Sequence, residues 1–230
     1  TATRWGPSGA VWATRCFCAL HSLRPGACQN QSSAPISNLG PHWPEVQGGI
    51  NLKNKFTVIY ADPPWKYNQN KASGAAEHHY PTMSIEEICA LPVEALAEKD
   101  AALFLWTTFP QLPEALQVIE AWGFSYRSVA FVWVKQNRRS PSWFYGLGYW
   151  TRGNVEICLL GIRGHPKRKS AAVHQLIVSP VEEHSKKPDI TREKIVELMG
   201  NVPKVELFAR QSIPGWECWG NEVKSTITLL

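Results

Sequence analysis

From residue 56 onward, short runs of apolar or β-prone residues alternate with longer stretches whose apolar positions recur at helical spacing. The runs are nearly continuous, as expected for strands that are buried on both faces of a parallel sheet. Strands that alternate with helices predict right-handed βαβ crossovers, and therefore an α/β fold with a mostly parallel, doubly wound sheet. The predicted strands are residues 56–61, 101–106, 129–134, 155–160 and 205–208.

Two helix starts are marked by capping signals. Ser84 and Glu87 have the spacing of a capping box, ahead of a helix through Ile88 and Leu91. Thr108 and Gln111 repeat that spacing, with Pro110 just inside the second predicted helix. The apolar positions of this second helix share one face, namely Leu112, Ala115, Leu116, Ile119 and Trp122.

Glycines mark where two helices end. Gly123 follows the second helix where a left-handed C-terminal cap is needed. Asp189 is placed to cap a third helix, through Ile195, Val196 and Met199, and Gly200 ends it.

Residues 1–49 differ in composition from the rest of the chain. They are rich in Ser, Pro, Gly and Arg, and their first acidic residue is Glu45. This composition is typical of a disordered basic arm, of a mitochondrial transit peptide or of residues outside the native reading frame, and these interpretations stay open. We expect a folded domain over residues 50–223 and a C-terminal tail over residues 224–230.

Composition and charge narrow the function classes. The 230 residues carry a formal net charge of +5, with 44% hydrophobic and 19% charged residues, as in globular proteins. No apolar run approaches the ~20 residues that span a bilayer, so we expect no membrane segment. The positive charge favours an anionic partner, although a solvated surface explains any one basic cluster equally well. The clusters are Lys135, Arg138 and Arg139; Arg163, His165, Lys167, Arg168 and Lys169; and Lys186 and Lys187.

The cysteines and histidines do not suggest a metal site. The six cysteines show no paired Cys-x-x-Cys spacing, which favours reduced thiols over a zinc site or a disulfide framework. His78 and His79 are adjacent, with no visible partners for a metal.

The first predicted strand ends in Asp62-Pro63-Pro64-Trp65, at the edge where open α/β sheets bind their ligands. On its own, Asp-Pro-Pro is a rigid turn, because both prolines fix φ and neither can donate to a sheet. Trp65 favours a site, since a large aromatic residue next to a strand-end carboxylate offers a platform for a planar ring.

These groups suit the exocyclic amine of adenine. The Asp62 carboxylate and the Pro63 carbonyl can accept the two amine hydrogens, which favours a tetrahedral nitrogen and stabilises positive charge as a methyl group arrives. Stacking on Trp65 is worth about 1–3 kcal/mol, comparable with the few kcal/mol that base flipping costs.

Further motifs follow in a fixed order, and together they resemble the DPPW-type adenine methyltransferases. This is the family of the catalytic subunit that methylates adenosine in eukaryotic mRNA, with many bacterial and phage members. The resemblance covers about residues 55–223. The matching segments are residues 62–65, 80–84, 104–106, 132–135, 156–161, 187–189 and 205–210, followed by Trp216 and residues 220–222.

The resemblance implies a Rossmann-like fold that uses S-adenosyl-L-methionine and has a permuted motif order, with the catalytic tetrapeptide before the cofactor-binding strand. By similarity, the catalytic loop consists of Asp62, Pro63, Pro64 and Trp65. The implied cofactor contacts are Asp62, Lys187, Glu206, Arg210, Asn221 and Glu222. The expected substrate contacts are Trp65, Tyr80, Lys135, Arg138, Arg139, Lys167 and Arg168.

Several of these residues have a structural alternative. Lys187 also fits a solvated lysine, Tyr80 a packing aromatic, and Glu206 needs a hydrogen-bond partner inside an apolar strand. The family's acidic residue upstream of the catalytic strand has no convincing match. Residues 146–148, Gly-Leu-Gly, lack the third glycine and the strand-to-helix context of a dinucleotide-binding loop.

The sequence therefore predicts an N6-adenine methyltransferase that acts on nucleic acid. DNA is favoured over RNA, because the compact single domain resembles bacterial and phage members. An N4-cytosine DNA methyltransferase and a catalytically silent nucleic-acid-binding subunit are the alternatives; Trp65 favours adenine, and the intact tetrapeptide argues against silence. We expect a monomer or homodimer, and a partner subunit stays open. We expect the protein in the cytoplasm, and the nucleus and the mitochondrion stay open.

Overall fold

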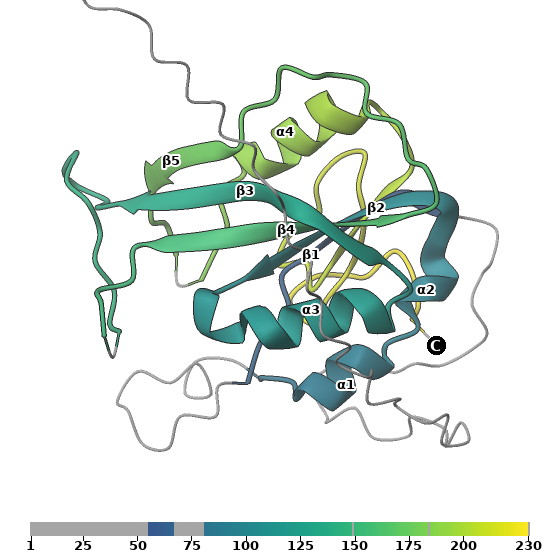
Figure 1. Ribbon diagram of the computed structural model, residues 1–230, viewed down its shortest axis with the longest axis horizontal. Helices are drawn as coiled ribbons and strands as arrows, with labels where there is room; N and C mark the ends of the chain where they lie inside the picture. Colours follow the sequence, from purple (N-terminus) through teal and green to yellow (C-terminus); the bar gives the residue numbers. More distant parts are fainter. Residues whose placement is uncertain (1–54, 67–80, 149, 184, 230) are drawn as a thin grey trace, which may run out of the picture. The chain divides into compact units, whose positions relative to one another are not determined.

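A computed structural model describes residues 55–66, 81–148, 150–183 and 185–229, which form one sheet with helices on both faces (Figure 1). All described residues belong to one compact unit, Ile36–Leu230. The elements in chain order are β1 (Phe56–Ala61), α1 (Ile85–Ala90), α2 (Val93–Leu96), β2 (Ala97–Thr107), the 3₁₀ helix η2 (Phe109–Gln111), α3 (Leu112–Ala121), β3 (Ser125–Gln136), β4 (Val155–Arg163), β5 (Leu176–Pro180), α4 (Ile190–Met199), β6 (Lys204–Leu207) and β7 (Glu217–Trp219).

The strands lie in the order β5-β3-β4-β2-β1-β6-β7. β4 is antiparallel to both of its neighbours, and the other strand pairs of the sheet are parallel. The predicted α/β class with a mostly parallel sheet is confirmed. β5 and β7 were not predicted, because β5 alternates exposed and covered residues and β7 has only three residues.

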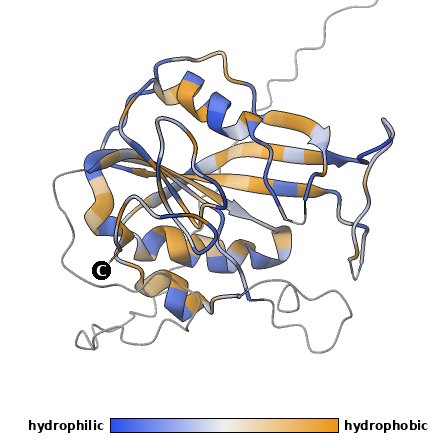
Figure 2. Cartoon of the chain, turned by 180° about the vertical axis from the view of Figure 1, so that it is seen from behind, coloured by the Kyte–Doolittle hydropathy of each residue, from blue (hydrophilic) through white to orange (hydrophobic). Residues whose placement is uncertain are grey.

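Alternate residues of the central strands enter two separate hydrophobic clusters. Ile59 and Leu103 pack in the cluster that includes the buried residues of α1, α2 and α3. Tyr60 and Phe104 point to the other face and pack in the cluster that includes Ile195 of α4. Figure 1 shows α1 and α3 on one side of the sheet and α4 on the other, and Figure 2 shows hydrophobic residues along the central strands and α3. The central strands are therefore covered on both faces, which explains their continuous apolar runs.

The predicted capping box of α1 is confirmed. The Glu87 backbone N–H donates to Ser84 Oγ at 3.2 Å, and the Ser84 backbone N–H donates to Glu87 Oε2 at 2.7 Å. The glycine stops are also confirmed, with a φ of 77° at Gly123 and 85° at Gly200.

The predicted capping box at Thr108 and Gln111 is wrong. Neither side chain caps a helix, because residues 109–111, with Pro110, form a 3₁₀ turn and α3 begins only at Leu112. The Gln111 side chain instead donates to the Lys66 carbonyl oxygen at 3.1 Å, next to the predicted catalytic loop.

The sheet directions bring one set of loops together. The parallel strands β1, β2, β3, β5 and β6 end at the same edge of the sheet, which we call the C-terminal edge. Antiparallel β4 begins at this edge, because Ile157 pairs with Thr107 at the end of β2. β4 ends at the opposite edge, where Arg163 pairs with Ala101.

Gly220 permits a close approach between the end of β7 and the chain after β6. A Cβ atom on Gly220 would lie 2.2 Å from the Ala209 carbonyl oxygen, and backbone cannot move aside as a flexible side chain can. We expect Gly220→Ala to lower the free energy of unfolding by about 1–3 kcal/mol in urea denaturation. Gly153→Ala is the control, because its Cβ would meet its nearest atom at 3.8 Å. Equal denaturation midpoints for the two variants would contradict this steric account.

Candidate active site

The chain after β1 forms a rigid turn at the C-terminal edge. The Trp65 backbone N–H donates to the Pro63 carbonyl oxygen at 2.9 Å, which closes a short turn around Pro64. The Met83 backbone N–H donates to the Pro64 carbonyl oxygen at 2.9 Å and fixes the turn to the segment before α1. These bonds hold the Pro63 and Pro64 carbonyls in a defined geometry.

Trp65 lies in the core rather than on an open surface. Its side chain is 6% exposed and belongs to the cluster beneath α1–α3, and its indole N–H donates to the Trp106 carbonyl oxygen at 3.2 Å. These contacts anchor the turn. The stacking role of Trp65 stays a prediction, and Tyr80 lies outside the described residues.

Asp62 belongs to a row of alternating charges. Lys187 Nζ lies 2.8 Å from Asp62 Oδ2 and 3.3 Å from Glu156 Oε2. The other Glu156 oxygen lies 2.5 Å from Lys135 Nζ. The sequence placed Lys187 near the cofactor or substrate, and the structure places it directly on the predicted catalytic carboxylate. Glu156, a carboxylate near the start of an apolar strand, was not among the site residues predicted from the sequence.

Burial and ion pairing set the protonation of this row. Burial raises the pKa of Asp62 above its ordinary value, and Lys187 offsets only part of that effect. Burial also acts to raise the pKa of Glu156, but Lys187 and Lys135 outweigh it and the pKa is lowered. Burial acts to lower the pKa of Lys187, but Asp62 and Glu156 outweigh it and raise the pKa. Lys187 therefore stays positive, and Asp62 titrates at a higher pH than an ordinary aspartate.

A cavity of about 450 Å³, its open mouth included, lies beside Asp62. The residues that line it come from segments far apart in the sequence. The predicted residues among them are Asp62, Pro63, Pro64, Arg210, Asn221 and Glu222, and the others are Pro81, Ser185 and Phe208. The cavity thus brings the predicted catalytic turn together with most of the predicted cofactor contacts. Arg210 and Glu222 are joined there by a 3.0 Å ion pair.

Ser185 and Phe208 line the cavity in an uncommon backbone conformation. Both have a φ of 61°, and they are the non-glycine residues of the described segments with positive φ. Such conformations cluster at binding and catalytic sites, where surrounding contacts enforce them. Because of this turn β6 ends at Leu207, so the predicted strand over residues 205–208 is shifted by one residue from the observed Lys204–Leu207. No signal in the sequence marks either conformation.

Glu206 does not line the cavity. Both of its carboxylate oxygens accept hydrogen bonds from Arg192 of α4, each at 2.7 Å, and its side chain is buried. This confirms that Glu206 needs a hydrogen-bond partner inside its apolar strand. The predicted cofactor role of Glu206 stays a prediction. Burial raises the pKa of Glu206, and Arg192 offsets part of the effect.

Asp189 stands at the predicted start of α4, but its side chain makes no cap hydrogen bond. Its carboxylate is instead paired with Lys186 at 3.0 Å and with Arg192 at 2.6 Å. The predicted cap is therefore wrong in its chemistry, since Asp189 extends the Glu206–Arg192 ion pair rather than binding a backbone N–H.

Comparison with known protein families identifies the family of this chain. Residues 56–222 match MT-A70, a span that runs from β1 to Glu222. The chain belongs to the MT-A70 family.

Named relatives of this MT-A70 chain are methyltransferases. The Type II methyltransferase M.MunI of Mycoplasma sp is 31% identical over 217 residues, which cover 86% of this chain and 87% of that protein. The N(6)-adenosine-methyltransferase MT-A70-like protein of Arabidopsis thaliana is 32% identical over 76% of this chain. The N(6)-adenosine-methyltransferase catalytic subunit METTL3 of Homo sapiens is 30% identical over the same share. The match spans only 24% and 29% of those two proteins.

The predicted basic contacts of the MT-A70 domain lie in different places. Lys135 is used in the ion pair with Glu156, while Arg138 and Arg139 are exposed at the C-terminal edge. Lys167 and Arg168 are exposed at the opposite edge, because β4 is antiparallel and carries the chain away from Asp62. The structure does not bring these last two residues to the cavity, and their phosphate contacts stay a prediction.

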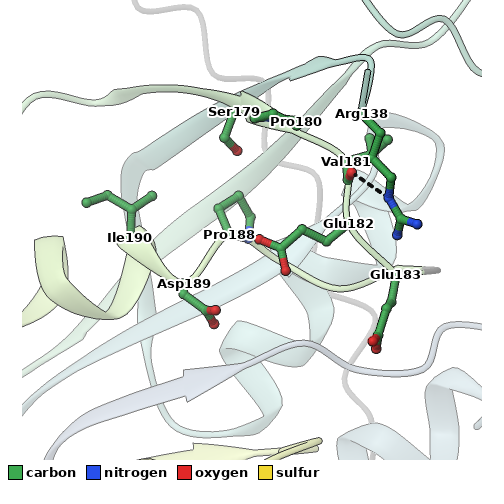
Figure 3. Close-up of a pocket in the computed structure, with 9 residues that line it drawn as sticks. All are labelled: Arg138, Ser179, Pro180, Val181, Glu182, Glu183, Pro188, Asp189 and Ile190. Carbon is green, nitrogen blue, oxygen red and sulfur yellow. Dashed lines mark hydrogen bonds between the residues drawn. The ribbon is translucent and has the colours of Figure 1, made fainter. Parts of the chain in front are cut away.

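A second hollow, of about 1030 Å³ with its open mouth included, lies beside the loop after β5 and is more open (Figure 3). Figure 3 shows Arg138, whose Nε donates to the Val181 carbonyl oxygen at 3.2 Å, near Glu182 and Glu183. Asp189 also lines this hollow. Carboxylates repel phosphate, so this hollow is a poor site for a nucleic-acid backbone.

The described segments were searched for a metal site and for a membrane-spanning helix. No group of three or more His, Cys, Asp or Glu residues there is arranged to hold a metal ion. No described helix is long and apolar enough to cross a membrane.

Proposed function

We propose that this MT-A70 domain transfers the methyl group of S-adenosyl-L-methionine to the N6 amine of adenine in nucleic acid, with DNA favoured over RNA. The observation that carries the proposal is the cavity in which Asp62 and Pro63 meet Arg210, Asn221 and Glu222. The permuted motif order is part of the proposal, since the catalytic turn follows β1, whereas Arg210 follows β6 and residues 221–222 follow β7.

The residues of the cavity suit the methyl donor. The Asp62 and Glu222 carboxylates favour a positively charged sulfur, while Asn221 and Arg210 offer donors for hydroxyl and carboxylate groups. When bound, S-adenosyl-L-methionine supplies the electrophilic methyl group on that sulfur.

Asp62 and Pro63 provide the acceptors for the adenine amine. Lys187 bonds to Asp62 Oδ2, and Oδ1 accepts no hydrogen bond from the described residues. The Pro63 carbonyl accepts one bond from Trp65, which leaves its second lone pair. These acceptors can take the two amine hydrogens and direct the nitrogen lone pair away from the purine ring.

The acceptors also stabilise the charge that develops during transfer. Transfer would form a nitrogen–carbon bond as the carbon–sulfur bond of the donor breaks, so the positive charge would pass from sulfur to the amine nitrogen. The Asp62 carboxylate lies where that charge appears, so it interacts more strongly with the transition state than with the neutral amine. The nitrogen then loses one proton to Asp62 or to water, and N6-methyladenine remains.

The preference for DNA is supported by the similarity to the Type II methyltransferase of Mycoplasma sp, which is 31% identical to this chain over 87% of its length. Incubation with S-adenosyl-L-methionine and DNA or RNA oligonucleotides, followed by mass spectrometry of the nucleosides, tests the proposal. We expect N6-methyl-2′-deoxyadenosine in the DNA; N4-methylcytosine would establish the alternative target, and no methylated nucleoside would contradict the proposal.

The pH profile tests the Asp62–Lys187 pair. Asp62 must be ionised to act, so kcat/KM should fall as the pH drops through its raised pKa, above the ordinary value of 3.8. Lys187→Met removes the cation that lowers this pKa, and the acidic limb should move to still higher pH. Lys186→Met is the matched control, because Lys186 pairs with Glu182 and Asp189 instead. An acidic limb at the same pH in both variants would exclude this electrostatic role of Lys187.

A further inference from the structure

The loop between β3 and β4 exposes an unusual set of large side chains. We call residues 137–154 the aromatic arm. Its exposed fractions are 46% at Trp143, 61% at Tyr145, 80% at Leu147 and 99% at Trp150. Exposed apolar groups gathered on one segment are typical of an interaction site.

The described part of the aromatic arm is held by its own hydrogen bonds. The Gly146 backbone N–H donates to the Gly153 carbonyl oxygen at 2.6 Å, so the two limbs of the arm pair with each other. The base is closed by the Lys135 backbone N–H, which donates to the Asn154 carbonyl oxygen at 2.9 Å. The exposed rings are thus carried by a loop whose backbone is held by hydrogen bonds.

Glycine is required where the limbs of the aromatic arm approach. A Cβ atom on Gly148 would lie 2.0 Å from the Thr151 carbonyl oxygen, and one on Gly146 would lie 3.0 Å from the Gly153 carbonyl oxygen. This explains the Gly-Leu-Gly sequence at residues 146–148, which lacks the context of a nucleotide-binding loop. The glycines shape the tip that presents Trp150.

The charge of the aromatic arm favours an anionic partner. Arg139 and Arg152 are exposed outside the acidic hollow that Arg138 lines, and residues 137–154 contain no Asp or Glu. Basic residues interleaved with exposed aromatic rings are the pattern that binds single-stranded nucleic acid, since arginines contact phosphates while rings stack on bases.

The aromatic arm leaves and rejoins the sheet at the C-terminal edge, where Asp62 lies. At its base, Lys135 and Glu156 form the ion pair that leads through Lys187 to Asp62. Figure 1 shows the arm projecting beyond the end of β3 and the start of β4. A nucleic-acid strand whose target base enters the cavity would therefore pass close to the aromatic arm.

We propose that the aromatic arm binds unpaired bases that flank the target adenine, with Tyr145 and Trp150 as stacking surfaces and the arginines as phosphate contacts. This proposal rests on the proposed function. An intact duplex covers the faces of its bases, so the arm should favour single-stranded or locally opened nucleic acid.

Fluorescence anisotropy with a labelled single-stranded oligodeoxynucleotide of about 12 nucleotides tests the aromatic arm. Trp150→Ala and Tyr145→Ala should each weaken binding about 5- to 150-fold, the range of one lost stacking contact. The binding of S-adenosyl-L-methionine should not change. Tyr126→Ala is the matched control, because Tyr126 is a 48% exposed aromatic residue near the other end of β3. Leu147→Ala controls for loss of apolar area on the arm itself and should have little effect.

Several outcomes would overturn the proposal. One is wild-type affinity for the single strand in Trp150→Ala, and another is an equal loss for an intact duplex of the same sequence. A wild-type chain that binds no single strand, or a loss that follows dissociation of a homodimer in sedimentation, would also overturn it.

Methyl transfer separates the aromatic arm from the proposed function. Adenine methylation with unchanged binding in Trp150→Ala would remove the role of the arm and leave the function. Binding that depends on Trp150, without any methylated nucleoside, would support the arm and remove the function.

Discussion

Asp62→Ala should abolish methyl transfer, with kcat reduced by more than about 10²–10³-fold. Removal of one preorganised group that stabilises transition-state charge typically reduces kcat by that factor. The variant loses the acceptor for the amine and the negative charge opposite the developing positive nitrogen. Transfer of a labelled methyl group to an oligonucleotide measures the effect. Asp62→Asn is the size-matched variant, which keeps an acceptor oxygen and loses the charge. Wild-type rates in either variant would remove Asp62 from the mechanism.

The same variants should keep their fold and lose no stability at neutral pH. The folded-state pKa of Asp62 is raised, so its protonated form is favoured in the folded protein. Its contribution to stability is therefore present at low pH and lost as the pH rises through the raised pKa. Lys187 retains Glu156 as a partner in the variant. Urea denaturation at several pH values should show the variant gaining on the wild type as the pH increases, and the opposite trend would contradict the raised pKa.

Arg192→Met should lower the free energy of unfolding by about 3–5 kcal/mol, because it leaves the Glu206 carboxylate buried without its cation. Arg192 supplies both hydrogen bonds to that carboxylate, and its side chain and that of Glu206 are 11% and 10% exposed. Urea denaturation of the purified variant gives the change. A loss below about 1 kcal/mol, as for an exposed ion pair, would contradict the account.

A double variant separates this ion pair from general damage. Arg192→Met combined with Glu206→Leu removes both charges and fills the space with apolar groups. Such replacements of buried pairs are often neutral, so the double variant should be more stable than Arg192→Met alone. Additive losses would show that the two residues act independently.

The turn that we propose to be catalytic could be located from the sequence because Asp62-Pro63-Pro64-Trp65 directly follows the end of a buried strand. The run at residues 56–61 is apolar on both faces, and Asp62-Pro63-Pro64 follows it without a gap. In a parallel sheet, that position lies at the C-terminal edge, where ligands bind. Residues 220–222 were found through their motif, and the structure brings Asn221 and Glu222 to the same cavity.

The direction of β4 could not be predicted from its residues. A buried antiparallel strand and a buried parallel strand have the same apolar pattern, and only the pairing partner distinguishes them. Lys167 and Arg168 follow β4, so this direction decides at which edge of the sheet they lie. The partners of buried charges also could not be predicted from one segment alone, because Glu206 contacts Arg192 only when β6 packs against α4.

The burial of Trp65 could not be predicted either. An aromatic residue after a strand reads as a platform, but its ring position depends on Trp106 and Met83 from two other segments. The backbone at Ser185 and Phe208 likewise follows from tertiary contacts, because neither residue type favours positive φ.

In the proposed mechanism, Asp62 and the Pro63 carbonyl hold the adenine amine beside the methyl donor. A crystal structure with S-adenosylhomocysteine and adenosine would show this contact. We expect the purine amine within about 2.6–3.2 Å of Asp62 Oδ1 and the Pro63 oxygen, facing the sulfur across the cavity. A purine bound elsewhere, or an amine that contacts neither acceptor, would contradict it.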